Sequence, residues 1–210
     1  MPGREAEALS IARGAAPWLI PGLLGAAGSI ALARRSPYHA AVATVATAAA
    51  AGMTWFFRDP PRSGKGLLLS GADGVVQSIE RWADGRTRVA VFMSPIDVHV
   101  NRAPIAGKIT SVEHIAGGHV PAFNKDSERN ERVVWKFETD LGELECVQIA
   151  GTVARRIVPY LEAGVTVEQG EKLGLIRFGS RFDIYLPEGV EPAVIVGQKT
   201  RAGETHLVCG

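Results

Sequence analysis

The amino-acid sequence predicts a mainly β domain, folded as a sandwich or barrel, that follows an N-terminal hydrophobic helical hairpin. Two long stretches without charged residues occupy most of the first 57 residues. Beyond residue 66 the chain changes to short runs rich in β-branched and aromatic residues, separated by Gly, Pro and Asp. Several short strands at such spacing are typical of sandwiches and barrels.

The chain has 210 residues, enough for one sizeable domain and an appendage. Its formal net charge is +1, so no overall positive field indicates nucleic acid as a partner. Cys146 and Cys209 lie far apart, and the five histidines form no metal-ligand spacing, so we expect no metal site. Cys146 falls in an apolar run, where a buried free thiol is expected.

The N-terminal region has two uncharged stretches, Ala15 to Ala33 and Tyr38 to Phe57, separated by Arg34-Arg35-Ser36-Pro37. Each is close to the roughly 20 residues that span a bilayer. Three arrangements fit: a helical hairpin in the membrane with the Arg pair as its turn, two helices lying in the interface, or two packed soluble helices. Aromatic residues near the ends of the stretches favour membrane association.

A Pro-, Gly- and Ser-rich linker from Asp59 to Gly66 separates this region from the β-rich part. We therefore expect an N-terminal membrane-associated segment over residues 1–63 and a catalytic β-rich domain over residues 64–210. Asp84-Gly85 lies between two expected strands and predicts a hairpin. The expected strands are 75–79, 88–92, 108–112, 132–137, 144–149 and 173–177.

The run Gly164 to Ile176 has the rhythm of lipoyl and biotinyl carrier domains, so lipoyl-carrier-like hairpins are expected in the β domain. Those carriers hold their cofactor on a lysine in a hairpin turn. Lys108 follows Gly107 but continues into an expected strand, which disfavours that role. The likeness therefore indicates shared geometry and not a carrier function.

The tripeptide Phe178-Gly179-Ser180 lies between two strand-like runs, so Gly179 and Ser180 are expected in or beside a tight turn. A serine hydroxyl in such a turn can attack the carbonyl of the preceding glycine, and glycine tolerates the unusual backbone angles that this requires. Elimination then cleaves the chain and leaves an N-terminal pyruvoyl group. A plain turn serine is the alternative, and the surrounding sequence is not the Gly-x-Ser-x-Gly of a hydrolase.

Several sequence runs support the interpretation of Gly179-Ser180 as a cleavage site. They are Ala72–Val76, Phe92–Ile109 with its Met-Ser-Pro-x-Asp-Val-His-Val-Asn-Arg core, Asn130–Arg132, Gln148–Ile157 and Arg177–Arg181. With these runs in this order, the chain resembles the phosphatidylserine decarboxylase family in its short bacterial and archaeal form. The resemblance extends from about Trp55 to Pro187.

The resemblance implies self-cleavage between Gly179 and Ser180, giving a heterodimer of a β chain (1–179) and an α chain (180–210), with higher oligomerisation left open. It implies a pyruvoyl cofactor made from Ser180, with neither pyridoxal phosphate nor metal. Phosphatidylserine in the membrane would then become phosphatidylethanolamine and CO₂ through a Schiff base, in phospholipid biosynthesis.

The resemblance also assigns Asp73 and His99 to catalysis, beside Ser180. A histidine suits proton transfer near neutral pH, and a carboxylate can orient and charge it. If His99 lies in a strand, it points opposite to the flanking valines. Longer family members carry a second histidine where this chain has Arg102, so the division of work between His99 and Arg102 stays open.

Four arginines, Arg102, Arg155, Arg156 and Arg181, are candidates for binding the substrate's phosphate or carboxylate, with Arg102 and Arg181 preferred. The expected location is the cytoplasmic face of the cell membrane, since the N-terminus lacks the features of a signal peptide. The alternatives are a non-enzymatic, membrane-anchored carrier-like module and a decarboxylase of an ether-lipid (archaetidyl) serine.

Overall fold

The computed structural model describes residues 10–118, 120, 129–151, 156–177 and 179–209. The chain divides into two compact units, Met1–Pro61 and Arg62–Gly210. Phe178 and Arg155, which were named in the sequence, lie outside the described residues.

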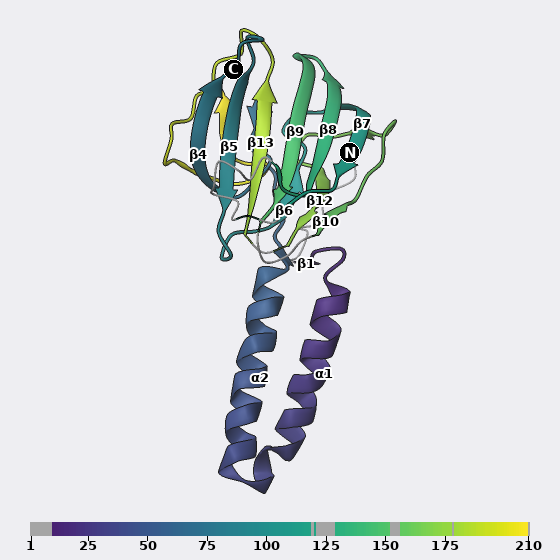
Figure 1. Cartoon of the computed structure of the whole chain (residues 1–210), viewed down its shortest axis with the longest axis vertical. Helices are drawn as coiled ribbons and strands as arrows, with labels where there is room; N and C mark the ends of the chain where they lie inside the picture. Colours follow the sequence, from purple (N-terminus) through teal and green to yellow (C-terminus); the bar gives the residue numbers. More distant parts are fainter. Residues whose placement is uncertain (1–9, 119, 121–128, 152–155, 178, 210) are drawn as a thin grey trace. The chain divides into compact units, whose positions relative to one another are not determined.

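The first unit is a helical hairpin closed by a short strand pair (Figure 1). Ser36 ends the connection between the helices, since its side chain accepts a hydrogen bond from the amide of His39, and Pro37 occupies the first turn that follows. In chain order the unit contains β1 (Ser10–Ile11), α1 (Ala16–Leu32), the 3₁₀ turn η1 (Ala33–Arg35), α2 (Pro37–Phe56) and β2 (Arg58–Asp59), with β1 antiparallel to β2. The helical hairpin with Arg34 and Arg35 in its turn is confirmed.

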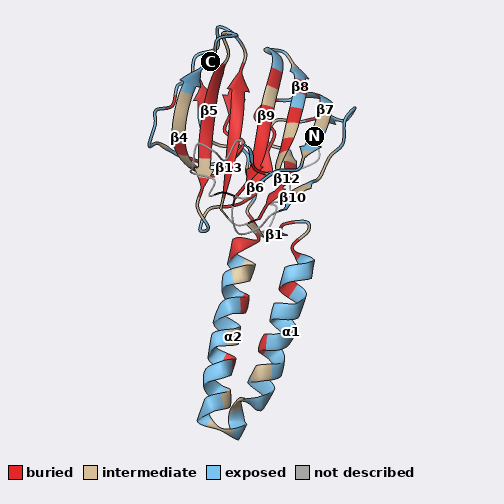
Figure 2. Ribbon diagram, viewed as in Figure 1, coloured by how far each residue is buried: buried red, intermediate tan, exposed pale blue. Residues whose placement is uncertain are grey.

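Both helices of the first unit expose most of their apolar side chains (Figure 2). Leu24 is 68% exposed on α1 and Val45 is 70% exposed on α2. The stretch Ala16–Arg35 is long and apolar enough to cross a membrane, with a mean hydropathy of 1.5 and 11% of its hydropathy window buried.

The second unit is built on an open eight-stranded antiparallel sheet with the order β11-β7-β8-β9-β13-β5-β4-β14. Because the order runs from one edge strand to another, the sheet does not close into a barrel. The hairpin predicted at Asp84-Gly85 joins β4 to β5, and Gly85 has a left-handed φ of 83°. The strands are β4 (Gly74–Arg81), β5 (Thr87–Met93), β7 (Gly107–Ile115), β8 (Arg132–Thr139), β9 (Gly142–Ala150), β11 (Thr166–Val167), β13 (Ser180–Leu186) and β14 (Lys199–Thr200).

Two smaller sheets complete this unit. A three-stranded antiparallel sheet has the order β10-β12-β6, formed by β10 (Ile157–Pro159), β12 (Lys172–Ile176) and β6 (Val100–Arg102). The other pairs β15 (His206–Val208) with β3 (Leu68–Leu69). The mainly β fold with an N-terminal hydrophobic hairpin is thus confirmed, and the six strands expected from the sequence are all present within a few residues of their expected bounds.

Strand β13 is the centre of the large sheet, paired with β5 on one side and β9 on the other. Phe182, Ile184 and Leu186 alternate along it into the main hydrophobic core, and each is fully buried. Cys146 on β9 is also fully buried and free, as expected, and burial raises the pKa of its thiol well above the ordinary value. The first residue of β13 is therefore held by strand pairing on both sides.

Candidate active site

Ser180 is the first residue of β13 and lies opposite Met93 of β5 and Ala150 of β9. Its side chain is fully buried, and its Oγ donates to the sulfur of Met93 at 3.4 Å. The prediction that the Gly-Ser pair lies in or beside a turn between two strands is confirmed, because β12 ends at Ile176, Gly179 lies in a bend and Ser180 begins β13. A thioether is a weak acceptor, so this contact leaves the serine hydroxyl available for other chemistry.

Gly179, on the other side of the same peptide bond, has a left-handed φ of 62°. No atom lies within 4 Å of the position that a Cβ would occupy there. Glycine is therefore favoured at this position by the backbone angle and not by crowding.

His99 lies one residue before β6 and is fully buried. Its Nδ1 is 3.0 Å from the carbonyl oxygen of Asp97. A carbonyl can only accept, so Nδ1 carries the proton and the lone pair of the neutral ring is on Nε2. The alternation expected for a strand does not apply to His99, because β6 begins only at Val100.

The loop that carries His99 is fixed by a compact turn over Ser94–Asp97. The amide and the hydroxyl of Ser94 donate to one carboxylate oxygen of Asp97 at 2.8 and 2.6 Å, and the amide of Asp97 donates back to the carbonyl of Ser94 at 2.9 Å. Pro95 occupies the second position of the turn, where its fixed φ is suited. The Asp97 carbonyl is thus held in place to orient the His99 ring.

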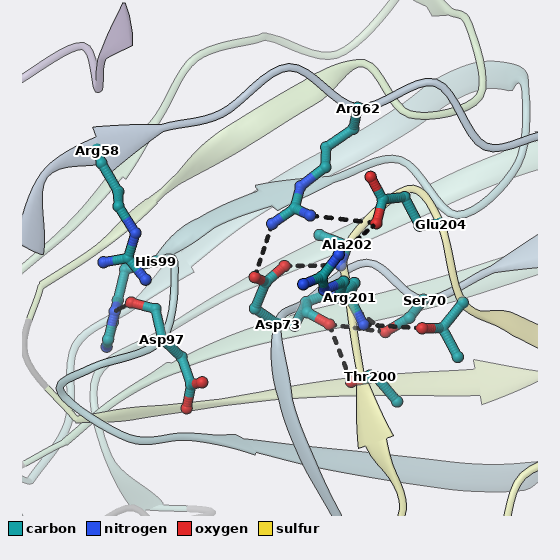
Figure 3. Close-up of polar contacts among 12 residues, drawn as sticks. Arg58, Arg62, Ser70, Asp73, Asp97, His99, Thr200, Arg201, Ala202 and Glu204 are labelled. Carbon is teal, nitrogen blue, oxygen red and sulfur yellow. Dashed lines mark hydrogen bonds and ion pairs between the residues drawn. The ribbon is translucent and has the colours of Figure 1, made fainter. Parts of the chain in front are cut away.

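Asp73 immediately precedes β4, and both of its carboxylate oxygens are engaged (Figure 3). One accepts from Arg62 at 2.8 Å and the other from the amide of Ala202 at 2.8 Å. Arg62 also donates to Glu204 at 3.2 Å. The structure therefore places Asp73 in a largely buried ion pair that holds the C-terminal segment.

Burial raises the pKa of Asp73 above its ordinary value, and Asp97 adds to this effect, while Arg62 and the Ala202 amide oppose it. The charge of Asp97 relates the Asp73 carboxylate to the turn that orients His99, whereas the hydrogen bonds of that carboxylate go to Arg62 and Ala202. A buried carboxyl group with a raised pKa is typical of functional sites.

The two arginines preferred for substrate binding have partners within the protein. Arg181 makes a two-pronged contact with Asp183, from Nε at 2.8 Å and from a terminal nitrogen at 2.8 Å. Arg102 donates to the carbonyl of Gly170 at 2.9 Å. Both are buried, at 4% and 5% exposure, so the structure gives each a structural role that the sequence did not indicate.

A buried polar chain behind Ser180 was not singled out from the sequence. Asn101 reaches the Met93 sulfur at 3.6 Å and the Gly71 carbonyl at 3.3 Å. It accepts from Gln148, which in turn accepts from the Trp135 indole, both at 2.9 Å. Met93, Asn101 and Gln148 all fall within the runs that carry the family resemblance, and that was the only signal in the sequence.

Within the described part of the chain, no group of three or more His, Cys, Asp or Glu side chains is placed to hold a metal ion. The chemical groups that the described site offers are a buried serine hydroxyl, a buried imidazole of fixed tautomer, and a carboxylate of raised pKa. These groups suit nucleophilic attack and proton transfer.

Fold and site together define a mainly β protein with a Gly–Ser junction at the start of β13, an inner strand of the large sheet that is buried along its whole length. A family model described as phosphatidylserine decarboxylase matches residues 49–208. The chain belongs to the phosphatidylserine decarboxylase family.

Named relatives are similar over nearly the whole chain. The phosphatidylserine decarboxylase proenzyme of Streptomyces griseus is 68% identical over 198 residues, which cover 94% of this chain and 92% of the relative. That of Thermobifida fusca is 61% identical, with 94% and 91% covered. A Halobacterium salinarum proenzyme, provisionally named for archaetidylserine decarboxylation, is 48% identical, with 94% and 98% covered.

Proposed function

We propose that this protein is a self-processing, pyruvoyl-dependent decarboxylase that converts phosphatidylserine to phosphatidylethanolamine and CO₂. The observation that carries the proposal is the Gly179–Ser180 junction: a buried serine hydroxyl directly follows a left-handed glycine in a chain of this family. The word proenzyme in the relatives' names supports a processing step.

Processing would use only groups of the chain and one water molecule. The Ser180 Oγ attacks the Gly179 carbonyl carbon, and the C–N bond breaks to leave an ester and a free amine. A base removes the Ser180 Cα proton, and the Gly179 carboxylate departs as the C–O bond breaks. Hydrolysis of the resulting dehydroalanine releases ammonia and leaves the pyruvoyl group. The products are a β chain ending at Gly179 and an α chain starting at former Ser180.

His99 is the candidate base for these proton transfers. The amide of Ile176, four residues before Ser180, donates to the His99 carbonyl at 3.2 Å, so the His99 loop runs beside the segment that leads to the junction. With Nδ1 directed at Asp97, the basic Nε2 is the nitrogen that accepts a proton.

Asp73 would act through charge. Its carboxylate, close enough to Asp97 for the two to influence each other, favours the protonated imidazole that forms when His99 accepts a proton. Arg62 and Ala202 fix the carboxylate in place and oppose the rise in its pKa that burial causes.

After processing, the pyruvoyl ketone supplies the electrophile that captures the substrate amine and the electron sink for loss of CO₂. The buried start of β13, between Met93 and Ala150, would hold this group away from bulk water. No pyridoxal phosphate is required by this scheme.

The proposed substrate is a lipid in a bilayer. The helical hairpin exposes an apolar surface that could associate with that bilayer. A core helix of a soluble protein would be mostly buried, whereas the apolar window within Ala16–Arg35 is 11% buried. Trp18 and Trp55, 45% and 60% exposed, lie near the start of α1 and the end of α2, and aromatic residues are enriched where helices reach a membrane interface. We place the protein at the cell membrane with its β unit on the cytoplasmic side.

Intact mass and denaturing electrophoresis test the proposal. Wild-type protein should give two pieces, of residues 1–179 and 180–210, with a ketone in place of an amine on the smaller one. Ser180→Ala should stay whole and make no phosphatidylethanolamine. Ser111→Ala is the matched control, because Ser111 lies on β7, which β8 and β9 separate from β13, and it should process normally. Full-length mass in active wild-type protein contradicts the proposal, and a whole, inactive wild type favours the non-enzymatic carrier-like module.

An ether-lipid serine is a second candidate substrate, favoured by the Halobacterium relative. The headgroup chemistry is the same for both lipids, so the comparison is made with diacyl and diether phosphatidylserine in matched vesicles. A preference of tenfold or more for the diether form would assign the protein to that substrate.

A further inference from the structure

Two arginines adjoin the last residue pair at one end of the three-stranded sheet. Strands β10 and β12 are antiparallel, and their last pair is Ile157 opposite Ile176. The next residues outward are Arg156 and Arg177, and the same register, continued by one residue, sets them opposite each other, in agreement with the effect of the Arg156 charge on Arg177. Directly opposed side chains on antiparallel strands lie within about 4.5–5.5 Å at Cβ.

This is an unfavourable place for two positive charges. Like charges in opposed positions destabilise a sheet. Arg177 is only 8% exposed, and burial together with the charge of Arg156 lowers the pKa of its guanidinium, an effect that Tyr160 opposes.

The arginine pair lies at the end of the three-stranded sheet that is next to His99. β12 pairs with β6 on its other side, with Leu175 opposite Val100, and the Ile176 amide bonds to the carbonyl of His99. Arg177 is separated from Ser180 by two residues. Arg156, Arg177 and the His99 backbone therefore lie at the same end of the three-stranded sheet. In the sequence, this end leads to the Gly179–Ser180 junction.

The chemistry of an amino-phospholipid headgroup matches this placement. Two carbon atoms separate its phosphodiester oxygen from its amine, so a substrate whose amine reaches position 180 keeps its phosphate within a few ångströms of it. Guanidinium groups bind phosphate oxygens through two parallel hydrogen bonds, and a bound anion would offset the repulsion between the two cations.

We propose that Arg156 and Arg177 form the subsite for the phosphodiester of the substrate, in place of Arg102 and Arg181. This proposal rests on the proposed function, because it assigns part of the same site. It predicts that the arginine pair contributes to binding more than to the bond-breaking step.

Kinetics on processed enzyme provide the first measurement. With a short-chain phosphatidylserine below its aggregation concentration, Arg177→Gln and Arg156→Gln should each raise KM about ten- to a hundredfold, the usual effect of losing a charged hydrogen bond, with little change in kcat. Arg177→Lys should recover part of the loss. Arg81→Gln, which removes an exposed arginine on β4, is the matched control and should leave KM unchanged.

Binding by calorimetry separates this inference from the proposed function. Glycerophosphoethanolamine should bind the uncleaved Ser180→Ala chain, and the additional Arg156→Gln change should abolish that binding whether or not any decarboxylation occurs. Loss of activity confined to anionic vesicles would mean that the arginines contact bulk lipid headgroups, which overturns the subsite. Unchanged KM and unchanged binding in the two glutamine variants overturn it as well. Because Arg156 is exposed, its variant tests the subsite even if Arg177→Gln fails to fold.

Discussion

At the scale of single residues, the junction depends on backbone angle and on the charge state of its neighbours. Gly179 has a left-handed φ with open space around it, and Asp73 has a carboxyl group that burial holds at a raised pKa. These two features are independent of each other, so each supports its own prediction.

Gly179→Ala is expected to fold and to process slowly. The left-handed backbone costs a residue with a Cβ about 1–2 kcal/mol, so the alanine chain will leave the reactive angle. Gly189→Ala is the matched control, because Gly189 also has a left-handed φ, of 80°, and open space, in a loop beyond β13. Cleavage time courses of the two variants give the comparison, and equal rates would show that the Gly179 angle has no role.

Asp73→Asn should slow processing by as much as about 10⁴-fold, the effect of removing the carboxylate from a Ser-His-Asp triad. Glu204→Gln serves as the control, since Glu204 is the second carboxylate on Arg62 and is 34% exposed in its side chain. If both variants mature at the same rate, Asp73 acts only as a partner of Arg62.

The pH dependence of processing should report on Asp73. Burial stabilises its neutral form, so the carboxyl group takes up a proton at a pH above the ordinary 3.8 as the solution is acidified. Processing should therefore decline on acidification with a midpoint above 3.8. The same raised pKa means that the group's favourable effect on folding is present below 3.8 and is lost as pH rises through the folded value. Rates from pH 3.5 to 7.5 in wild type and Asp73→Asn test this, and a wild-type midpoint at or below 3.8 would contradict it.

At the scale of elements, β13 is held by strand pairing on both sides, and a buried chain of polar side chains contacts Met93, the residue opposite its first position. Its pairing with β5 and β9 fixes Ser180, and the Asn101–Gln148–Trp135 chain crosses the core to the Met93 sulfur. A fully satisfied buried chain of this type is rigid, because each lost link leaves a buried polar group without its partner.

Trp135→Phe is expected to destabilise the β unit by about 1–3 kcal/mol, since it removes the donor to Gln148 and leaves a buried amide oxygen unsatisfied. Trp82→Phe, at a position 41% exposed, should change stability by less than about 0.5 kcal/mol. Urea unfolding of both variants in the Ser180→Ala background, which avoids mixtures of cleaved and uncleaved chain, measures the difference. Similar urea midpoints for the two variants would show that the buried polar chain does not contribute to stability.

At the scale of the whole molecule, the division between the two units falls between Pro61 and Arg62. The ion pair from Arg62 to Asp73 therefore lies within the β unit. The boundary expected from composition, at residue 64, would separate Arg62 from the site that it supports.

A chain that starts at Arg62 should fold and cleave itself, because every contact described for the junction lies within that unit. A chain that starts at Gly64 should cleave more slowly, since Asp73 loses its ion-pair partner. Both should lose activity on phosphatidylserine vesicles and keep it on a monomeric short-chain substrate, because they lack the exposed apolar hairpin. Full activity of the Arg62 chain on vesicles would show that the hairpin is not needed to reach lipid.

The sequence alone determined the mainly β class, the helical hairpin, the hairpin at Asp84-Gly85 and the position of the Gly179–Ser180 turn. Each of these depends on local periodicity or on a short motif, which neighbouring residues suffice to encode. Only the tertiary structure decided what each charged side chain contacts. Arg181 pairs with Asp183 and Arg102 with a backbone carbonyl, while the last pair of a ladder, Ile157 and Ile176, brings the neighbouring Arg156 and Arg177 to the same end of a sheet. Those contacts depend on strand order and register, which bring together residues that no local pattern relates.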